Sequence, residues 1–182
     1  MNYAEIKNCD IANGPGIRVS LFVSGCTHHC KGCFNEIAWD FQYGKPFTQD
    51  TINHIMQLLE PAHVKGLTLL GGEPFEPQNQ LPIVELLRQV KQKYPEKSVW
   101  AFSGYLFDKD MQAGKLGPWE ITKEFLSYLD VLVDGPFIQE KKDLSLRFRG
   151  SSNQRLINVP ASLEAEHVVL WEDWQGNGRE LK

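Results

Sequence analysis

Four short apolar runs along the chain are typical of buried strands, at residues 17–23, 66–70, 98–102 and 130–134. Between these runs, apolar residues recur at helical spacing. They predict a helical turn over 36–39 and three helices, which run from the N-cap Thr48 to Pro61, from about Leu81 to Tyr94, and from Trp119 to Leu129. A turn-rich stretch with two glycines and a proline, residues 10–16, leads into the first strand.

Strands that alternate with helices indicate right-handed βαβ units and a parallel sheet. Four candidate site residues then come at the carboxyl end of a strand, all on one edge of the sheet: Cys26, Gly72, Ser103 and Asp134. Parallel sheets and barrels bind their ligands at that edge. Because a closed barrel of eight units needs at least about 200 residues, we expect an α/β fold with a partial, open (β/α) TIM-type barrel.

Length, composition and charge narrow the class of protein. The 182 residues suit one domain, and a hydrophobic fraction of 42% with 23% charged residues is ordinary for a globular chain. The formal net charge of −4 argues against nucleic acid as a partner. No run of eighteen apolar residues predicts a membrane span. The N-terminus does not resemble a secretion signal, so clustered cysteines indicate a reducing compartment, and we expect the cytoplasm.

Three of the four cysteines lie within eight residues, in the loop after the first strand: Cys26, Cys30 and Cys33. Thiolates are soft ligands for iron–sulfur clusters, zinc or Cu(I). A [4Fe–4S] cubane usually has four cysteine ligands, so three would leave one iron open to a small molecule. Alternatively, His28 or His29 could complete a zinc site in a zinc-binding interaction module. Cys9 is interpreted as a small, half-buried apolar residue.

The cysteine loop, Cys-x3-Cys-x2-Cys, resembles that of radical S-adenosylmethionine (SAM) enzymes, and Gly71-Gly72-Glu73-Pro74 resembles the second motif of that superfamily. The resemblance implies a partial (β/α)6 barrel and a [4Fe–4S] cluster on the three cysteines, with SAM chelated at the open iron. Reductive cleavage of SAM then yields a 5′-deoxyadenosyl radical. It also implies that Gly71, Gly72 and Glu73 contact the amino group of SAM.

Other cofactor contacts are expected from position. Many superfamily members have an aromatic residue directly before the third cysteine; here Gly32 holds that place, and Phe34 follows Cys33. We expect Gly32, Cys33 and Phe34 to lie near SAM, and Ser103 and Asp134 to reach its ribose or methionine end. The cofactor carries the chemistry, so no side chain is expected to act as a catalytic acid or base.

Further motifs resemble one family, the anaerobic ribonucleoside-triphosphate reductase activating proteins. These motifs are residues 13–18, the cysteine loop through Asn35, residues 71–74, 102–105, 131–135 and the run Arg149-Gly150-Ser151-Ser152-Asn153-Gln154. The resemblance covers a barrel domain over 1–158 and leaves 159–182 as a C-terminal extension of uncertain structure.

The resemblance implies a partner and an electron donor. The partner is the large anaerobic reductase, on which a backbone glycine becomes a radical, and the donor is a protein such as flavodoxin. Activation of another glycyl-radical enzyme, such as pyruvate formate-lyase, is the alternative within this class. We expect Phe34, the arginine-rich stretch 144–155 or the tail to contact the partner, and Trp171 and Trp174 to serve in packing or partner contacts.

Overall fold

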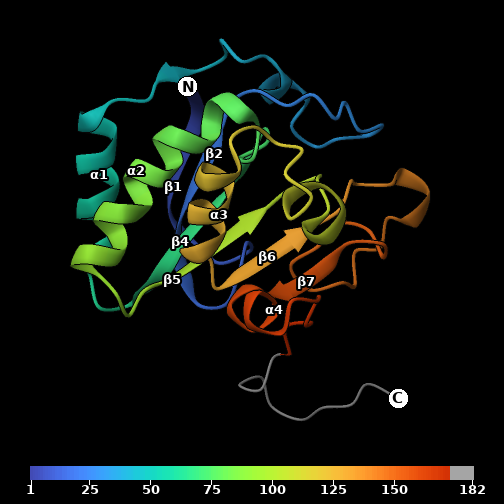
Figure 1. The fold of residues 1–182 in the computed structure, drawn as a ribbon. Coiled ribbons are helices and arrows are strands. Elements are labelled where there is room, and N and C mark those ends of the chain that lie inside the picture. The colour runs from blue at the N-terminus through green and yellow to red at the C-terminus, as the bar shows by residue number, and fades with distance from the viewer. Residues whose placement is uncertain (173–182) are drawn as a thin grey trace.

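The computed structural model describes residues 1–172, and within them the chain forms an open sheet of seven strands (Figure 1). Across the sheet the order is β3 (Lys45–Pro46), β1 (Asn2–Asp10), β2 (Ile17–Val23), β4 (Val64–Gly71), β5 (Ser98–Phe102), β6 (Val131–Asp134) and β7 (Arg155–Asn158). Strands β2, β4, β5 and β6 are parallel, whereas β1, β3 and β7 pair antiparallel with their neighbours. The predicted α/β class and parallel centre are confirmed.

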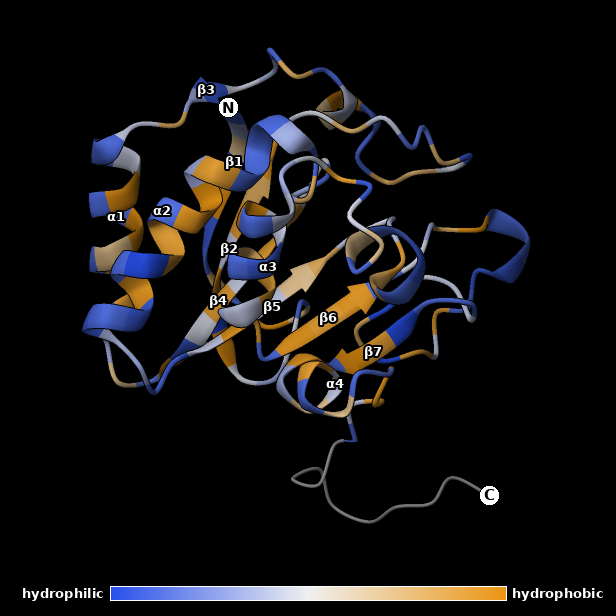
Figure 2. Cartoon of the chain, in the orientation of Figure 1, coloured by the Kyte–Doolittle hydropathy of each residue, from blue (hydrophilic) through white to orange (hydrophobic). Residues whose placement is uncertain are grey.

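Three helices connect the parallel strands: α1 (Gln49–Leu59), α2 (Pro77–Lys93) and α3 (Trp119–Ser127). They lie on the same face of the sheet, and Figure 2 shows their apolar sides turned toward it. Their buried residues share one core with alternate residues of the strands, such as Val19 and Leu21 in β2 and Leu67 and Leu69 in β4. This alternation follows from the period of two along a strand, and it fixes which side chains face the helices.

The sequence predicted the ends of most of these elements closely. The 3₁₀ turn Glu36–Trp39 and helix α1 form where they were expected, and the backbone N–H of Thr48 donates to Thr51 Oγ1 at 3.2 Å at the start of α1. Helix α2 begins at Pro77, four residues before the predicted start. The early start is possible because a proline in the first turn loses no helical hydrogen bond. A π-helical turn, Phe107–Met111, follows β5.

The antiparallel strands β1 and β7 were not predicted. Strand β1 is mostly half-exposed or exposed and contributes only Tyr3 and Ile6 to the edge of the core, so its apolar signal is weak. Strand β7 has four residues, of which only Ile157 is fully buried. Short strands near the edge of a sheet need few apolar residues, because one of their sides meets solvent.

The face of the sheet opposite the helices has a second, smaller core. Trp100 of β5 and Val131 and Val133 of β6 are buried there under Phe148 and Trp171. The ring centroid of Trp100 lies 5.3 Å from that of Phe148 and 5.1 Å from that of Trp171, in edge-to-face contacts. Trp171 therefore has a packing role, which is one of the two roles predicted for it. Trp174 lies outside the described residues.

The first part of the C-terminal extension packs against the sheet. Helix α4 (Val159–Ala165) follows β7 directly, and Val159 is fully buried in the main core. Leu170 forms an isolated antiparallel bridge to Ile157. In the part of the chain that the structure describes, every helix is too short or too polar to cross a membrane.

A buried arginine anchors the turn that precedes β2. The side chain of Arg18 is fully buried and donates hydrogen bonds to Thr68 Oγ1 at 2.7 Å and to Ser98 Oγ at 2.9 Å. The hydroxyl of Thr68 in turn donates to the carbonyl oxygen of Asn13 at 2.8 Å. Burial lowers the pKa of Arg18 to about 10, which leaves it cationic at neutral pH. Arg18 and Thr68 together hold Asn13 against the sheet.

Candidate functional site

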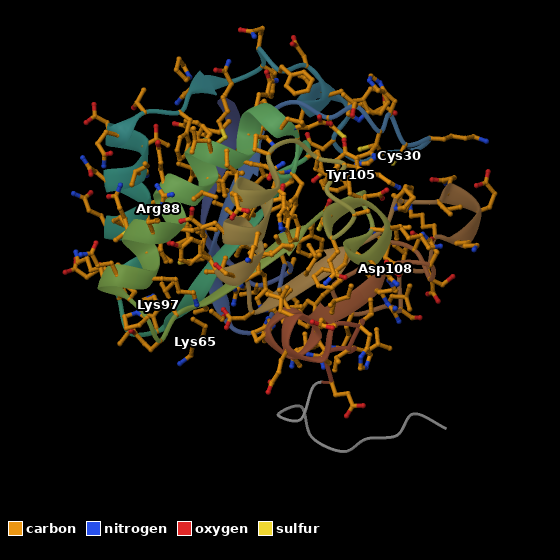
Figure 3. The ribbon with its side chains drawn as sticks, viewed as in Figure 1. Cys30, Lys65, Arg88, Lys97, Tyr105 and Asp108 are labelled. Atoms are coloured by element: carbon orange, nitrogen blue, oxygen red, sulfur yellow. The ribbon has the colours of Figure 1, made fainter. Side chains whose placement is uncertain are left out.

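A cavity of about 540 Å³ opens at the carboxyl ends of the parallel strands. Its size is within the usual range for cofactor sites. Its walls come from the cysteine loop after β2, the turn after β4, the loop after β5 and the segment 135–154. Figure 3 shows Cys30 and Tyr105 at this end of the molecule, whereas Lys65 and Lys97 lie at the opposite end.

All three loop cysteines line the cavity: Cys26, Cys30 and Cys33. None of them is in a disulfide. Gly25 directly precedes the loop and Gly32 lies within it, at φ of 95° and 72°, a left-handed backbone that glycine adopts readily. The backbone N–H groups of Gly25 and Cys26 donate to the carbonyl oxygens of Ala38 and Trp39 at 2.8 and 3.2 Å, so the turn 36–39 supports the base of the loop.

The turn Gly71-Gly72-Glu73 is bound to the cysteine loop through its backbone. Gly72 N–H donates to the carbonyl oxygen of Val23 at 2.7 Å, and Glu73 N–H donates to that of Gly25 at 2.8 Å. A Cβ atom on Gly72 would lie 2.5 Å from the oxygen of Gly25 and 2.9 Å from that of Ala38. Only glycine permits this close approach. The two motifs therefore form one unit at the edge of the sheet.

The Glu73 carboxylate is buried and joins three loops. Its Oε1 accepts from Phe75 N–H and Ser103 Oγ, both at 2.9 Å, and its Oε2 accepts from Gly104 N–H at 2.7 Å. His28 Nε2 lies 3.0 Å from Oε2. Glu73 and Ser103 thus lie together at the cavity, on the edge of the sheet where they were predicted. Both carboxylate oxygens of Glu73 already have hydrogen-bond partners within this chain.

Burial alone would lower the pKa of His28, but the hydrogen bond and negative charge of Glu73 outweigh it, and Glu76 and Asp110 add to the effect. The pKa of His28 therefore lies above its ordinary value. His28 also packs edge-on against Tyr105, with ring centroids 4.3 Å apart. These contacts give His28 a positioning role in the loop, whereas His29 packs against Trp39 at 4.6 Å.

A second buried glutamate holds the cysteine loop from below. Glu76 Oε1 accepts hydrogen bonds from Thr27 N–H at 2.8 Å and from Thr27 Oγ1 at 2.6 Å. Asn79, one turn further along α2, donates its amide to the carbonyl oxygens of Ser24 and Glu73, both at 3.0 Å. The sequence pattern did not predict these contacts of Glu76 and Asn79. In the sequence they are recognisable only as polar residues at the start of a helix that directly follows the glycine turn.

The other predicted cofactor contacts divide into two groups. Gly32 and Phe34 line the cavity, and a Cβ on Gly32 would lie 2.2 Å from Gln139 Oε1, so the segment after β6 packs closely on the cysteine loop. Asp134 does not line the cavity. Its Oδ2 accepts from Phe107 N–H at 2.8 Å and its Oδ1 accepts from Arg155 Nε at 2.9 Å. The structure thus brings together all the predicted site residues except Asp134.

Comparison with known proteins agrees with this geometry. The profile of a family described as "4Fe-4S single cluster domain" matches residues 12–157. The chain is 42% identical over 156 residues to the anaerobic ribonucleoside-triphosphate reductase-activating protein of Enterobacteria phage T4, an alignment that covers 86% of this chain and 93% of that protein. It is 40% identical over 156 residues to the protein of the same name from Escherichia coli K12, with 85% and 96% covered.

A third relative, from Vibrio cholerae, bears the same name and is 42% identical over 159 residues, which cover 85% of this chain and 96% of that one. The chain belongs to the anaerobic ribonucleoside-triphosphate reductase-activating protein family. The predicted family is therefore confirmed. Membership also decides between the two metal interpretations of the cysteine loop, because the matched domain is defined by a 4Fe–4S cluster and not by zinc.

The residues at the cavity suit such a cluster. In a cubane each cysteine binds a different iron, so its ligands surround a volume instead of converging on one ion. The three free thiols line one cavity, and within residues 1–172 no three His, Cys, Asp or Glu side chains converge on a single-ion site. Burial raises the pKa of the Cys26 thiol to about 12 and also raises that of Cys30. Binding iron must therefore displace protons from these thiols.

Proposed function

We propose that this protein is a radical SAM activase that generates a glycyl radical on the anaerobic ribonucleoside-triphosphate reductase. The observation that carries the proposal is the set of three free cysteines around one cavity, in a chain whose relatives are named as activators of that reductase. Three thiolates leave one iron of a cubane without a protein ligand, by the logic that leaves a catalytic zinc with an open position.

A reduced cluster held by these residues would supply the one electron needed for reductive cleavage of SAM to methionine, and the deoxyadenosyl group would take a hydrogen atom from the reductase glycine as 5′-deoxyadenosine and leave the radical on that glycine. The chain itself binds, orients and shields. Cys26, Cys30 and Cys33 hold three irons. The turn 71–73 forms the wall beside them, supported by Glu73 and Ser103.

We assign SAM contacts to the cavity-lining members of the predicted set, namely Gly32, Cys33, Phe34, Gly71, Gly72, Glu73 and Ser103. The Glu73 carboxylate accepts hydrogen bonds from four groups of this chain, and its backbone N–H and carbonyl oxygen are bonded to Gly25 and Asn79, so we assign Glu73 a packing contact with SAM and a role in holding the cavity wall. For Asp134 we propose a positioning role. It connects β6 to Arg155 on β7 and to the π-helical turn at Phe107, and so fixes the loops on that side of the cavity.

The proposal extends to the fold and to the electron donor. We infer that the sheet is an arc of a (β/α) barrel, formed by 1–158 and followed by an extension, because its parallel strands have their helices on one face and their site at the carboxyl edge. An external donor such as flavodoxin would reduce the cluster. The need to keep three ligand thiols reduced favours the cytoplasm.

One anaerobic experiment tests the function. Reconstituted protein, dithionite, SAM and the purified reductase are mixed, and the glycyl radical is measured by electron paramagnetic resonance. We expect a radical on the reductase together with 5′-deoxyadenosine in solution. Pyruvate formate-lyase, treated in the same way, provides the control for partner choice. A radical on pyruvate formate-lyase and none on the reductase would reject the proposed partner.

A further inference from the structure

A second cavity, of about 380 Å³, lies beside the smaller core on the face of the sheet opposite the helices. Phe148 and Trp171, which cover that core, form part of its wall. The three loop cysteines lie outside its lining, but it shares three lining residues with the cysteine cavity, all within 148–154. This segment therefore separates two different cavities, and the proposed function assigns no role to the second one.

The polar part of the second cavity is strongly basic. Three of the ten described residues that line it are arginines, Arg147, Arg149 and Arg155, and none of the ten is acidic. The whole chain has a net charge of −4, so this basic lining is a local feature. A guanidinium group stays charged at any physiological pH, and its fork of N–H donors matches the oxygens of a phosphate. A cavity lined by one sign of charge attracts a ligand of the opposite sign.

The charge of Arg155 is already balanced within the protein. Its Nε donates to Asp134 Oδ1 at 2.9 Å, and its Nη2 donates to Asp108 Oδ1 at 2.8 Å (Figure 3 labels Asp108). Two carboxylates thus fix this guanidinium and cancel its charge. We therefore assign the recognition of an anion to Arg147 and Arg149.

Both of these arginines are held at the cavity by neighbouring groups. Arg149 Nη1 donates to the carbonyl oxygen of Gln154 at 2.7 Å. The guanidinium carbon of Arg147 lies 5.0 Å from the ring centroid of Phe148, in a cation–π contact. Gln154 Oε1 in turn accepts from Gly150 N–H at 2.9 Å and so fixes the loop that carries both arginines. Groups that are positioned before binding lose less conformational entropy when a ligand arrives.

The remaining wall offers an apolar surface next to the arginines. Phe148, Leu156 and Trp171 are half-buried, and Leu170 is 58% exposed. A small inorganic anion needs no such surface, whereas a flat ring would bury apolar area against it. The polar side chain of Asn153 also lines the cavity, and an amide can hydrogen-bond to the hydroxyl groups of a sugar.

We propose that the second cavity is a binding site for a nucleotide. Its phosphates contact Arg147 and Arg149, and its base packs against Leu156, Leu170 and Trp171. The size of the cavity is within the usual range for small-molecule sites. The inference goes beyond the proposed function and does not depend on it, because the site uses neither the cysteines nor the glycine turn.

Calorimetric titration of ATP into the anaerobically reconstituted protein tests the site. The protein is left unreduced and is saturated with SAM, which keeps ATP out of the cysteine cavity. We expect ATP to bind, and adenosine and tripolyphosphate each to bind at least about tenfold more weakly, since each lacks one of the two recognised parts. Adenosine that binds as tightly as ATP would overturn the role of the arginines. Tripolyphosphate that binds as tightly as ATP would overturn the assignment to a nucleotide.

Arg147→Ala places the site. Arg147 is exposed and lines the second cavity but not the cysteine cavity, so its replacement should leave the fold and SAM cleavage with dithionite unchanged. Arg88→Ala, which removes another exposed arginine on the helical side, is the matched control. We expect at least about tenfold weaker ATP binding in Arg147→Ala, the effect of losing hydrogen bonds to a charged group, and wild-type affinity in Arg88→Ala.

Leu170→Glu provides a second, independent variant. It adds a negative charge to the cavity wall at an exposed position, and Leu81→Glu does the same at an exposed position on α2. ATP affinity should fall at least about tenfold in Leu170→Glu and stay at the wild-type level in Leu81→Glu, with unchanged circular dichroism in both. Wild-type ATP affinity in both Arg147→Ala and Leu170→Glu, or release of bound ATP by excess SAM, would overturn the site.

Discussion

The carboxylate of Glu76 holds Thr27 by two hydrogen bonds, at 2.8 Å from its backbone N–H and 2.6 Å from its hydroxyl. Glu76 is the residue before helix α2, and Thr27 directly follows the first cysteine. The contact therefore ties the cysteine loop to the beginning of a helix that is packed into the core. Loops that carry ligands gain precision when a rigid element supports them in this way.

Replacement of Glu76 by alanine should loosen this support. Two donors of Thr27 would lose their partner, and because Thr27 is exposed and water can take the place of Glu76, each lost hydrogen bond should cost about 0.5–1.5 kcal/mol. We expect lower cluster content after reconstitution and faster loss of iron to a chelator, while the helices remain folded by circular dichroism. Glu85→Ala, at an exposed position on the same helix, is the control. Equal rates of iron loss in both variants would contradict the role of Glu76.

The four cysteines should behave differently on mutation. Alanine at Cys26, Cys30 or Cys33 removes one iron ligand, and we expect each variant to lose the cluster and all SAM cleavage. Cys9→Ala should keep both, because Cys9 lies on β1 outside the cavity, where it is exposed and not half-buried as the sequence suggested. Iron and acid-labile sulfide analysis of anaerobically purified variants measures this. Cluster loss in Cys9→Ala would mean that the cubane has a fourth protein ligand.

Gly72→Ala tests the close contact between the two motifs. The added methyl group would lie 2.5 Å from the carbonyl oxygen of Gly25, so either the turn or the cysteine loop must move. We expect a lower Tm and weakened SAM binding, measured by calorimetry on the reconstituted protein. Gly114→Ala gives the comparison, since its methyl group meets no atom within 4 Å and only its φ of 68° opposes alanine. An effect no larger than that of Gly114→Ala would argue against tight coupling of the motifs.

Arg18 should matter more for folding than any surface arginine. Arg18→Ala would leave a void and would remove the donors to Thr68 and Ser98, so we expect a loss of roughly 3 kcal/mol in the free energy of unfolding. Arg88→Ala breaks an exposed ion pair with Glu124 and should change stability little (Figure 3 labels Arg88 on the helical side). Urea unfolding compares the two, and equal midpoints would contradict the anchoring role of Arg18.

Much of the fold and of the site could be predicted because the signals were local. The strands before Cys26, Gly72 and Ser103 are mostly apolar runs, and a parallel sheet places their ends together. The residues that were missed act through tertiary contacts. Glu76 and Asn79 look like ordinary polar residues at a helix start, and only the folded chain reveals that they hold Thr27, Ser24 and Glu73. Asp134 was expected to contact SAM because it lies at the end of a predicted strand.

Arg155, which lies beside Asp134, explains why the Asp134 side chain does not line the cavity. Strand β7, which gives no strong pattern in the sequence, brings Arg155 beside Asp134, and an arginine that pairs with a buried carboxylate satisfies it within the protein. A short strand of four residues contains too few positions to reveal alternation. The same short strand therefore explains why β7 was not predicted and why Asp134 lies outside the cavity lining.

We have proposed that three cysteines hold a cubane whose remaining iron binds SAM. This proposal is tested most directly by electron paramagnetic resonance of the anaerobically reconstituted, dithionite-reduced protein, recorded before and after SAM is added. We predict about four irons per chain and a reduced-cluster signal whose shape changes when SAM binds. A protein that binds no iron, or a cluster signal that SAM leaves unchanged, would contradict the account.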